Sequence, residues 1–219
     1  MPSEATANSY SWITRGDYAG LRISGISMVF VCNRSQESVQ DTLGLRAEVD
    51  DADMLTPGGP FLVSVYADPA GAIVFERSGY LAALRPVMEE LSIGTTAAGV
   101  SRTFEGDIVF AYAQQGAVIS AFNVDDPTAR RGYAPDAIAR QIEDLGFPVF
   151  DDDLDEEDEE GEAEDDDEHL KRQQAFRCAL ALCTQLTDLR LTQEHLLTPL
   201  PRYPTASLYS RGGASTPMV

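Results

Sequence analysis

The longest apolar run in this chain is Ile26-Ser-Met-Val-Phe-Val-Cys32, and its β-forming side chains predict a buried strand. Directly after it, Ser35 can cap the start of a short helix, and Gly44 can end that helix. Two further apolar segments flank Asp68-Pro-Ala-Gly71, whose residues favour a tight turn and so predict a β-hairpin. The chain is therefore expected to begin with a strand, a helix and a hairpin.

A second helix and three more strands are predicted after the hairpin. Apolar residues recur with helical spacing from Leu81 to Leu91, and Pro86 either bends this helix or lies near its start at Arg85. Strand-like segments separated by glycine-bearing turns follow at residues 98–104, 108–113 and 117–123. Three strands with such tight turns predict an antiparallel meander.

The order of these elements indicates the fold class. The first six follow the strand–helix–strand–strand–helix–strand order of ferredoxin-like folds, and the meander extends that order. Pro135-Asp136 predicts the start of a further helix, which Gly146 ends. We therefore expect an α+β fold in which an antiparallel sheet of about six strands packs with helices. More helices are expected toward the C-terminus.

Composition divides the chain into a core and its outer segments. Residues 1–10 are polar and are predicted to form a flexible tail before an α+β core at 11–147. An acidic linker is expected at 148–168, and C-terminal helices at 169–197 are expected to pack on the core. Prolines and polar residues in 198–219 predict a disordered tail.

The negative charge of the chain is concentrated in one segment. The sequence holds 36 acidic and 16 basic residues, a net charge of −20, and fifteen of the acids lie between Asp151 and Glu168. The remaining 21 acids nearly balance the 16 bases. Direct nucleic-acid binding is disfavoured because affinity for phosphate requires clustered lysine and arginine. Lys171 is the single lysine, which excludes a lysine-dependent phosphate loop elsewhere in the chain.

The sequence carries no signal for a membrane span, for secretion or for a metal site. No apolar run approaches the ~20 residues of a transmembrane helix, so no membrane partner is expected. The first residues do not resemble a signal peptide, and Cys32, Cys178 and Cys183 form no CxxC pair. Free buried thiols and a cytoplasmic location are predicted. No metal and no cofactor are expected, because no ligand spacing or cofactor motif is present.

Polar residues near strand ends and glycines are the candidates for ligand or partner binding: Glu76, Ser92, Thr95, Arg130 and Arg131. The two adjacent arginines can grip a carboxylate or phosphate with their forked guanidinium groups. Alternatively, they pair with Asp125 and Asp126 in a surface loop. Glu76 ends a hairpin strand, where it either faces Arg131 or keeps an edge strand soluble. No residue is assigned a catalytic role.

The acidic run has three interpretations. A calcium loop is disfavoured because Pro148 and the polyacidic lead-in oppose the helix that must enter such a loop. A nucleic-acid mimic usually spreads its carboxylates over a folded surface, whereas these carboxylates are consecutive. A solvated linker is favoured, because like charges repel and extend the chain into an acidic arm. The acids at the start of this arm are Asp151, Asp152, Asp153, Asp155, Glu156, Glu157, Asp158, Glu159 and Glu160.

Several short motifs resemble an uncharacterised bacterial domain family of unknown function. They are Trp12, Leu91-Ser-Ile-Gly-Thr95, Arg131-Gly132 and Pro135-Asp136, and the resemblance covers residues 10–197. It implies a scaffold built on glycines, aromatic residues and helix caps, and it implies no particular activity. The acidic run looks like an addition to the linker of that family.

The leading functional hypothesis is a non-enzymatic protein-interaction module of an immunity-like, regulatory or accessory kind. The lack of a catalytic set, the expected exposed edge strands and the acidic arm favour it, with a basic protein as the partner. Two alternatives stay open. One is a small-ligand-binding protein or enzyme that uses the polar candidates at strand ends, and the other is an acidic nucleic-acid mimic.

Overall fold

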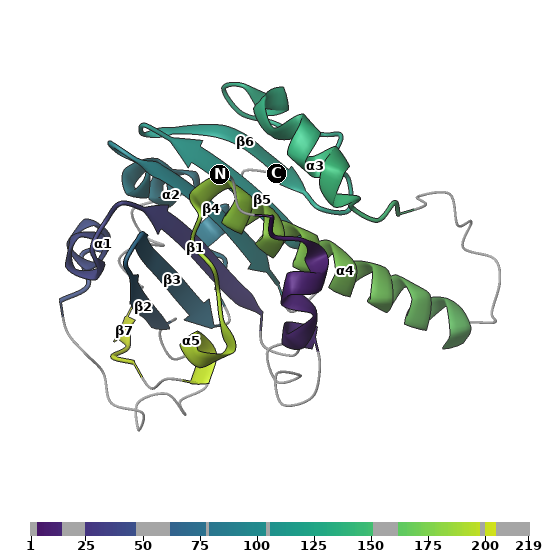
Figure 1. Ribbon diagram of the computed structural model, residues 1–219, viewed down its shortest axis with the longest axis horizontal. Coiled ribbons are helices and arrows are strands. Elements are labelled where there is room, and N and C mark those ends of the chain that lie inside the picture. Colours follow the sequence, from purple (N-terminus) through teal and green to yellow (C-terminus); the bar gives the residue numbers. More distant parts are fainter. Residues whose placement is uncertain are drawn as a thin grey trace.

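An antiparallel sheet organises the computed structural model (Figure 1). Its described strands are β1 (Ile26–Cys32), β2 (Leu62–Asp68), β3 (Gly71–Arg77), β4 (Thr96–Arg102), β5 (Ile108–Gln114), β6 (Ala117–Asn123) and β7 (Tyr203–Pro204). Their order across the sheet is β6-β5-β4-β1-β3-β2-β7. The structure describes residues 4–14, 25–46, 62–77, 79–103, 106–150, 162–197 and 200–204.

Helices cover both faces of this sheet (Figure 1). The α-helices are α1 (Gln36–Leu43), α2 (Arg85–Leu91), α3 (Ala139–Leu145), α4 (Glu162–Thr187) and α5 (Gln193–Leu197). Short 3-10 helices are η1 (Ala7–Thr14), η4 (Leu81–Ala83) and η5 (Pro135–Ile138). The described part of the chain therefore forms three layers, with the sheet in the middle.

The first four strands confirm the predicted ferredoxin-like arrangement. β1 lies between β3 and β4, and β2 pairs with the other side of β3, with every pair antiparallel. α1 lies between β1 and β2 in the chain, and α2 lies between β3 and β4. β4, β5 and β6 then form the predicted meander. The α+β prediction is correct, and the described sheet exceeds the expected six strands because β7 adds to β2.

Local sequence signals set the bounds of the first elements. Ser35 Oγ accepts a hydrogen bond from a backbone N–H in the first turn of α1, and Gly44 ends this helix with a φ of 69°. In the β2–β3 turn, the Asp68 carboxylate accepts a hydrogen bond from the backbone two residues later, at 2.8 Å. α2 begins at Arg85, so Pro86 lies in its first turn, where the missing N–H has no helical partner to lose.

One face of the sheet packs against α1, η4 and α2, which we call the crossover layer. β1 points Val29 and Val31 toward this layer, because successive side chains of a strand alternate between faces. Val39 and Leu43 of α1 are fully buried against them. These helices connect neighbouring strands, so the crossover layer is built from segments close together in the sequence.

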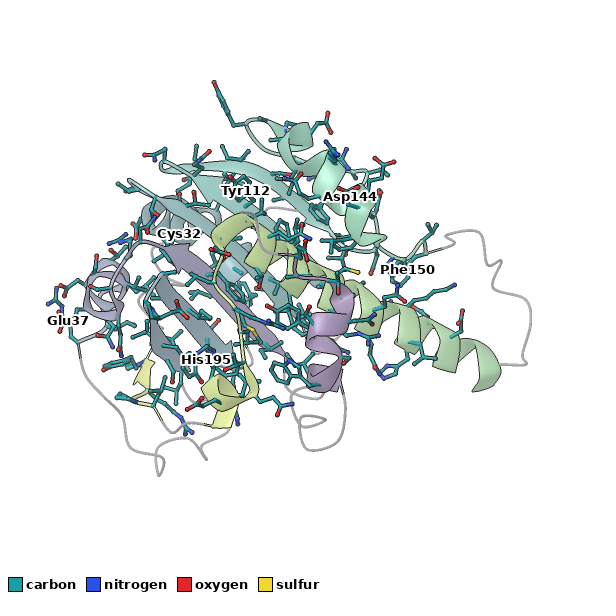
Figure 2. All side chains as sticks on the ribbon, viewed as in Figure 1. Cys32, Glu37, Tyr112, Asp144, Phe150 and His195 are labelled. Carbon is teal, nitrogen blue, oxygen red and sulfur yellow. The ribbon has the colours of Figure 1, made fainter. Side chains whose placement is uncertain are left out.

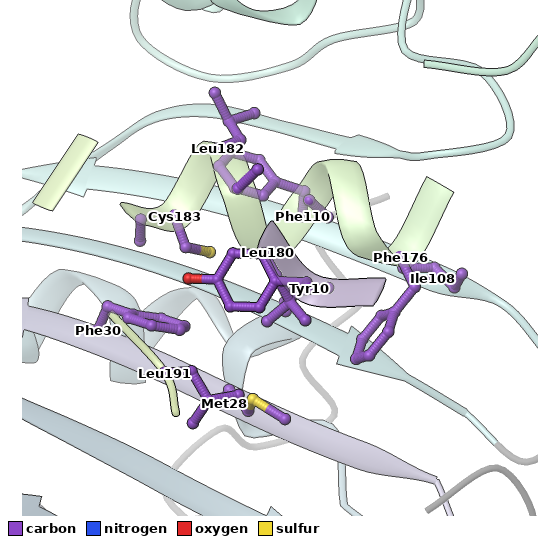
Figure 3. Packing of buried hydrophobic residues seen from close by; sticks show 14 of the residues in the cluster. Tyr10, Met28, Phe30, Ile108, Phe110, Phe176, Leu180, Leu182, Cys183 and Leu191 are labelled. Atoms are coloured by element: carbon purple, nitrogen blue, oxygen red, sulfur yellow. The ribbon is translucent and has the colours of Figure 1, made fainter. Parts of the chain in front are cut away.

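The opposite face packs against η1, α3, α4 and α5, which we call the α4 layer. Met28 and Phe30 of β1 join Tyr10 of η1 and Leu180 of α4 in one buried cluster (Figure 3). The Tyr10 hydroxyl forms a short hydrogen bond with the hydroxyl of Thr184, 174 positions away in the chain. In this layer an N-terminal segment and a helix near the C-terminus therefore pack together on one face of the sheet.

The predicted flexible tail at residues 1–10 is wrong for the part that the structure describes. Tyr10 is fully buried, Ala5 is buried, and η1 packs along α4. Gln185 donates a hydrogen bond to the Ala5 carbonyl at 2.8 Å. The prediction treated a polar composition as evidence of disorder, although the few apolar side chains of this segment are the ones that face α4.

Two boundaries near the C-terminus also differ from the prediction. α4 begins at Glu162, so its first turns occupy the end of the predicted linker at 148–168. Acidic side chains near a helix N-terminus are favourable because they face the positive end of the helix dipole. β7 pairs with β2 inside the predicted disordered tail. The acidic residues 151–160 and the tail from 205 onward lie outside the described residues.

Candidate binding pocket

Glu76 is a buried anchor and does not face Arg131. Its side chain is fully buried on β3, and one carboxylate oxygen accepts a hydrogen bond from the Leu81 backbone N–H at 3.1 Å. Strands β1, β4 and β5 separate β3 from β6, where Arg131 lies. The carboxylate therefore holds the start of η4, on a strand that lies inside the sheet and away from Arg131.

A neighbouring pair of serines holds the same part of η4. Ser27 Oγ lies 2.7 Å from Ser101 Oγ, and it accepts a hydrogen bond from the Ala82 backbone N–H at 2.8 Å. Both serines are buried. Buried polar groups of this kind stabilise a fold only when they are hydrogen-bonded, and these satisfy backbone groups of η4. The buried side chains of Glu76, Ser27 and Ser101 beneath η4 are thus part of the scaffold.

The two adjacent arginines lie in the loop between β6 and η5. Arg130 pairs with Asp136, at 2.7 Å between Nη2 and Oδ1, and it also donates to the Pro127 carbonyl. Asp126 instead accepts hydrogen bonds from Thr128, which lower the pKa of the Asp126 carboxyl. Arg130 thus pairs with Asp136, its charge also contributes to the lowered pKa of Asp126, and the backbone of Arg131 bonds to Ala121. The grip of an anion by the two side chains stays a prediction.

Arg131-Gly132 matters through its backbone. The Arg131 N–H and carbonyl both hydrogen-bond to Ala121 of β6, at 2.8 and 2.7 Å. The next two backbone N–H groups that face β6 bond to the Val118 and Ile119 carbonyls. A Cβ on Gly132 would lie 2.3 Å from the Ile119 carbonyl oxygen, so only glycine allows this close pairing.

The expected exposed edge strands are partly covered. Residues 131–134 cover the edge of β6 through these backbone hydrogen bonds. On the other side of the sheet, β7 pairs with the first two residues of β2, Leu62 and Val63. Covering an edge protects it from pairing with another chain. The described edges therefore lend less support to strand addition by a partner than the sequence suggested.

Ser92 and Thr95 are brought together at the turn between α2 and β4. Ser92 Oγ donates to the Glu89 carbonyl at 3.1 Å and accepts from the Gly116 N–H at 3.2 Å. Thr95 Oγ1 donates to the Cys32 carbonyl at 2.6 Å, which ties the start of β4 to the end of β1. Both hydroxyls serve the scaffold. Glu76, Ser92, Thr95 and Arg131 do not line a common pocket.

Thr95 nevertheless lies in the wall of a cavity of about 610 Å³. We call this cavity the Arg34 pocket. It opens where the end of β1, α1 and the turn after α2 meet, and it is lined by Asn33, Arg34, Thr42, Glu90, Ile93, Gly94 and Thr95. Asn33 and Gly94 both have positive φ values, 50° and 71°, because the chain turns sharply at each wall of the opening.

The Arg34 guanidinium is held along the surface of α1. Nε and Nη2 donate to Ser38 Oγ at 3.1 and 2.8 Å, and Nη2 also donates to the Ser38 carbonyl at 3.1 Å and to Thr42 Oγ1 at 2.6 Å. Thr42 Oγ1 in turn donates to the Ser38 carbonyl. Among the described residues, neither a carboxylate nor any other acceptor bonds to Nη1 of Arg34. One wall of the pocket thus carries a positive charge that hydrogen bonds to α1 hold in place.

Sequence reasoning missed Arg34, although a signal was present. Ser38 and Thr42 are four residues apart, which places them on one face of a helix, and Arg34 precedes Ser38 by the same spacing. They also follow a buried strand directly, a common position for binding residues. What the sequence lacked was the second wall of the pocket, since Glu90 and Gly94 come from a turn more than 50 positions later.

The three thiols are poor nucleophiles. Burial, together with the nearby Asp188 carboxylate, raises the pKa of the Cys32 thiol to about 11. Burial raises the pKa of Cys178 to about 11 and that of Cys183 well above its usual value. A reactive cysteine requires a thiolate near neutral pH, so none of these residues is placed for nucleophilic chemistry.

The described residues contain neither a metal-binding cluster nor a membrane-spanning helix. No group of three or more His, Cys, Asp or Glu side chains lies together in a way that could hold a metal ion. Nor does any helix in this part of the chain combine the length and apolar character needed to cross a membrane.

The comparison with family models decides the relationship of this chain. The model of a family of unknown function, DUF6461, matches residues 63–205, which is most of the chain. The chain belongs to this family. The matched range includes the β2–β3 hairpin, the meander and α4, and the resemblance to a domain family of unknown function is confirmed. Neither the curated proteins nor the solved structures contain a significant match.

The family match also sorts the motifs. Leu91–Thr95, Arg131-Gly132 and Pro135-Asp136 lie inside the matched range, whereas Trp12 precedes it. In the structure these three segments form turns and backbone contacts: the wall of the Arg34 pocket, the cover of β6 and the start of η5. Arg34 precedes the matched range as well.

Proposed function

We propose that this protein is a non-enzymatic interaction module that binds a basic protein through its acidic arm, residues 151–168. Its role is of an immunity-like, regulatory or accessory kind. The observation that carries the proposal is the density of charge, with fifteen acids in eighteen consecutive residues. Such a segment attracts a basic surface over a distance of about one Debye length, roughly 8–10 Å at physiological salt.

The position of the arm supports this role. α4 packs on the sheet through its second half, while its first turns extend beyond the sheet (Figure 1). The described acids on these turns are exposed, and two of them pair within the helix, Asp167 with Lys171 at 3.2 Å and Glu168 with Arg172 at 2.7 Å. These pairs are surface ion pairs between residues four apart, which contribute little to stability. Carboxylates in this segment can therefore change partners at little cost.

Capture from a host lysate at low salt tests the proposal with two variants of equal charge. The arm variant replaces the seven acids of residues 151–158 by their amides. The control replaces seven exposed acids elsewhere by amides: Glu4, Glu37, Asp41, Asp107, Glu143, Asp144 and Glu194. Both variants become less negative by the same amount, so a nonspecific charge effect changes them equally.

We expect the natural chain and the control variant to capture the same basic protein. The arm variant should lose it, and salt of a few hundred millimolar should release it from the natural chain. Equal capture by both variants would show that the arm is not the binding segment. Capture of no protein by the natural chain at low salt would count against an interaction module altogether.

A further inference from the structure

We propose that the Arg34 pocket binds a carboxylate that carries one negative charge and a short apolar group. The residues that line this site are not those of the acidic arm. Glu37 of α1 and Phe150, the last described residue before the arm, lie on opposite sides of the molecule (Figure 2). The site therefore adds a second binding function to the one proposed above and does not depend on it.

The guanidinium of Arg34 supplies the positive charge that recognises the ligand. Its Nε and Nη2 donate hydrogen bonds to Ser38 and Thr42, and these bonds fix the plane of the group before a ligand binds. A guanidinium fixed in this way loses little further freedom on binding. Arg34 lines the cavity, and its Nη1 bonds to no other described residue. Hydrogen bonds from a charged donor to a carboxylate are among the strong ones in proteins.

Glu90 limits the charge of the ligand. It lines the same cavity as Arg34, so any anion in the pocket meets one positive and one negative side chain. Glu90 offsets part of the attraction of Arg34, and the net attraction rises only in proportion to the charge of the anion, whereas the cost of removing the anion from water rises with the square of that charge. A phosphate group near neutral pH is therefore a poorer ligand here than a carboxylate.

Ile93 and Gly94 shape the remaining wall. Ile93 is 64% exposed, one of the few large apolar side chains of the described chain that face solvent. It can cover a short apolar group, whose removal from water is favourable. A Cβ on Gly94 would meet no atom within 4 Å, so the mouth of the pocket is open at this position.

Nuclear magnetic resonance titration of the full-length protein with sodium butyrate tests the site. Butyramide is the matched ligand control, because it has almost the same shape and no charge. We expect butyrate to shift the backbone amide signals of Asn33, Arg34 and Gly94 in a saturable way, and butyramide to leave them unchanged. Equal shifts from the two ligands would overturn the proposal. Tighter binding of inorganic phosphate than of butyrate would overturn the single-charge assignment.

Protein variants connect the binding to Arg34. Arg34→Gln is expected to weaken butyrate binding at least tenfold, whereas Arg46→Gln, at an exposed arginine just after the same helix, should bind as the natural chain does. Gly94→Asn keeps Arg34 and adds a side chain at the open mouth; asparagine tolerates the positive φ of this position. It should also weaken binding. Undiminished binding by both Arg34→Gln and Gly94→Asn would refute the site.

The source of the carboxylate can be read in the same experiment. A short peptide with a free C-terminus and the same peptide with an amidated C-terminus replace butyrate and butyramide. Tighter binding of the free peptide than of butyrate would assign the pocket to the chain end of a protein. Equal or weaker binding would assign it to a free small acid. Binding of the amidated peptide as strongly as the free one would contradict recognition of a carboxylate.

Discussion

The two helical layers of this protein cover the same sheet but are assembled from different parts of the chain. The crossover layer consists of α1, η4 and α2. Each of these helices connects two strands that are consecutive in the sequence and are separated by one strand in the sheet. The α4 layer brings η1 from the N-terminus against α4 near the C-terminus. Both layers bury apolar clusters of similar kind. The two layers differ in the number of residues between the elements that contact each other: this number is small in the crossover layer and large in the α4 layer.

The two layers also carry the two proposed binding functions separately. The Arg34 pocket lies in the crossover layer, between α1 and the turn after α2. The described end of the acidic arm forms the first turns of α4, which is part of the other layer. Each proposed binding function is thus attached to one layer, and perturbing one layer should leave the binding function of the other largely intact.

Tyr10→Ala is the strongest test of the α4 layer. The side chain is fully buried, and truncating a buried aromatic residue costs about 3 kcal/mol or more of unfolding free energy. Tyr10→Phe keeps the ring and removes only the hydrogen bond to Thr184, so it should cost about 1 kcal/mol. Urea denaturation measures both values. If Tyr10→Ala changes the midpoint no more than Tyr10→Phe does, the N-terminal segment does not stabilise this layer.

Gly99→Ala tests how closely the crossover layer packs on the sheet. A Cβ at this position of β4 would lie 2.8 Å from Ala82 Cβ and 2.9 Å from the Met28 carbonyl oxygen. Overpacking of this kind should reduce the unfolding free energy by about 1–3 kcal/mol. Adding Ala82→Gly removes one of the two clashes and should recover only part of the loss. An unchanged urea midpoint for Gly99→Ala would mean that η4 lies farther from the sheet.

Ser35→Ala is expected to have a smaller and local effect. Ser35 Oγ caps the first turn of α1, and loss of such a cap typically costs about 1 kcal/mol. Because Arg34 bonds to the same helix, fraying of its first turn should also weaken butyrate binding slightly. Ser9→Ala is a control in another helix start, where the serine accepts a hydrogen bond from the Thr6 N–H. A larger loss of butyrate binding in the control would contradict this connection.

Thiol reactivity gives the smallest signal and reports on the α4 layer. Cys32 donates to the Thr187 carbonyl and Cys178 to the Leu145 carbonyl, so both contact this layer, and Cys183 lies inside it. In the folded protein at neutral pH, a thiol reagent should modify half-buried Cys32 first and Cys183 last. Equal rates for Cys32 and Cys183 would show that the layer opens as a unit. In denaturant all three should react at similar rates.

The raised pKa values also set the direction of a pH effect. In the unfolded chain a thiol ionises near pH ~8.5, whereas burial raises the pKa of Cys32 and Cys178 to about 11 in the folded protein. The protonated thiols therefore favour the folded state fully below pH ~8.5, and this contribution is lost as the pH rises toward 11. Urea midpoints measured between pH 8 and 10.5 should fall. Replacing both cysteines by alanine should flatten that fall, and an unaltered slope would contradict the assignment.

Candidate site residues were predicted less well than elements, for a physical reason. Ser92 and Thr95 do lie together, because only three positions separate them in a turn. Glu76 was expected near Arg131, but its place depends on the order of strands across the sheet. Arg34 became a candidate only when the turn after α2 closed the second wall of its pocket. Spacing along the chain predicts neighbours on one element, whereas a pocket needs two.

The sequence by itself determined the elements of the crossover layer and the central strands. Apolar runs, the Ser35 cap and the turn at Asp68 act over a few residues, so they can be recognised without knowledge of the remaining chain. Only the tertiary structure decided that segments near the two ends of the chain are packed on the sheet or paired with it. Tyr10 is buried because α4 lies beside it, and Tyr203 is paired because β2 offers an edge. Such contacts close loops of more than a hundred residues, and their energy depends on partners that no local pattern specifies.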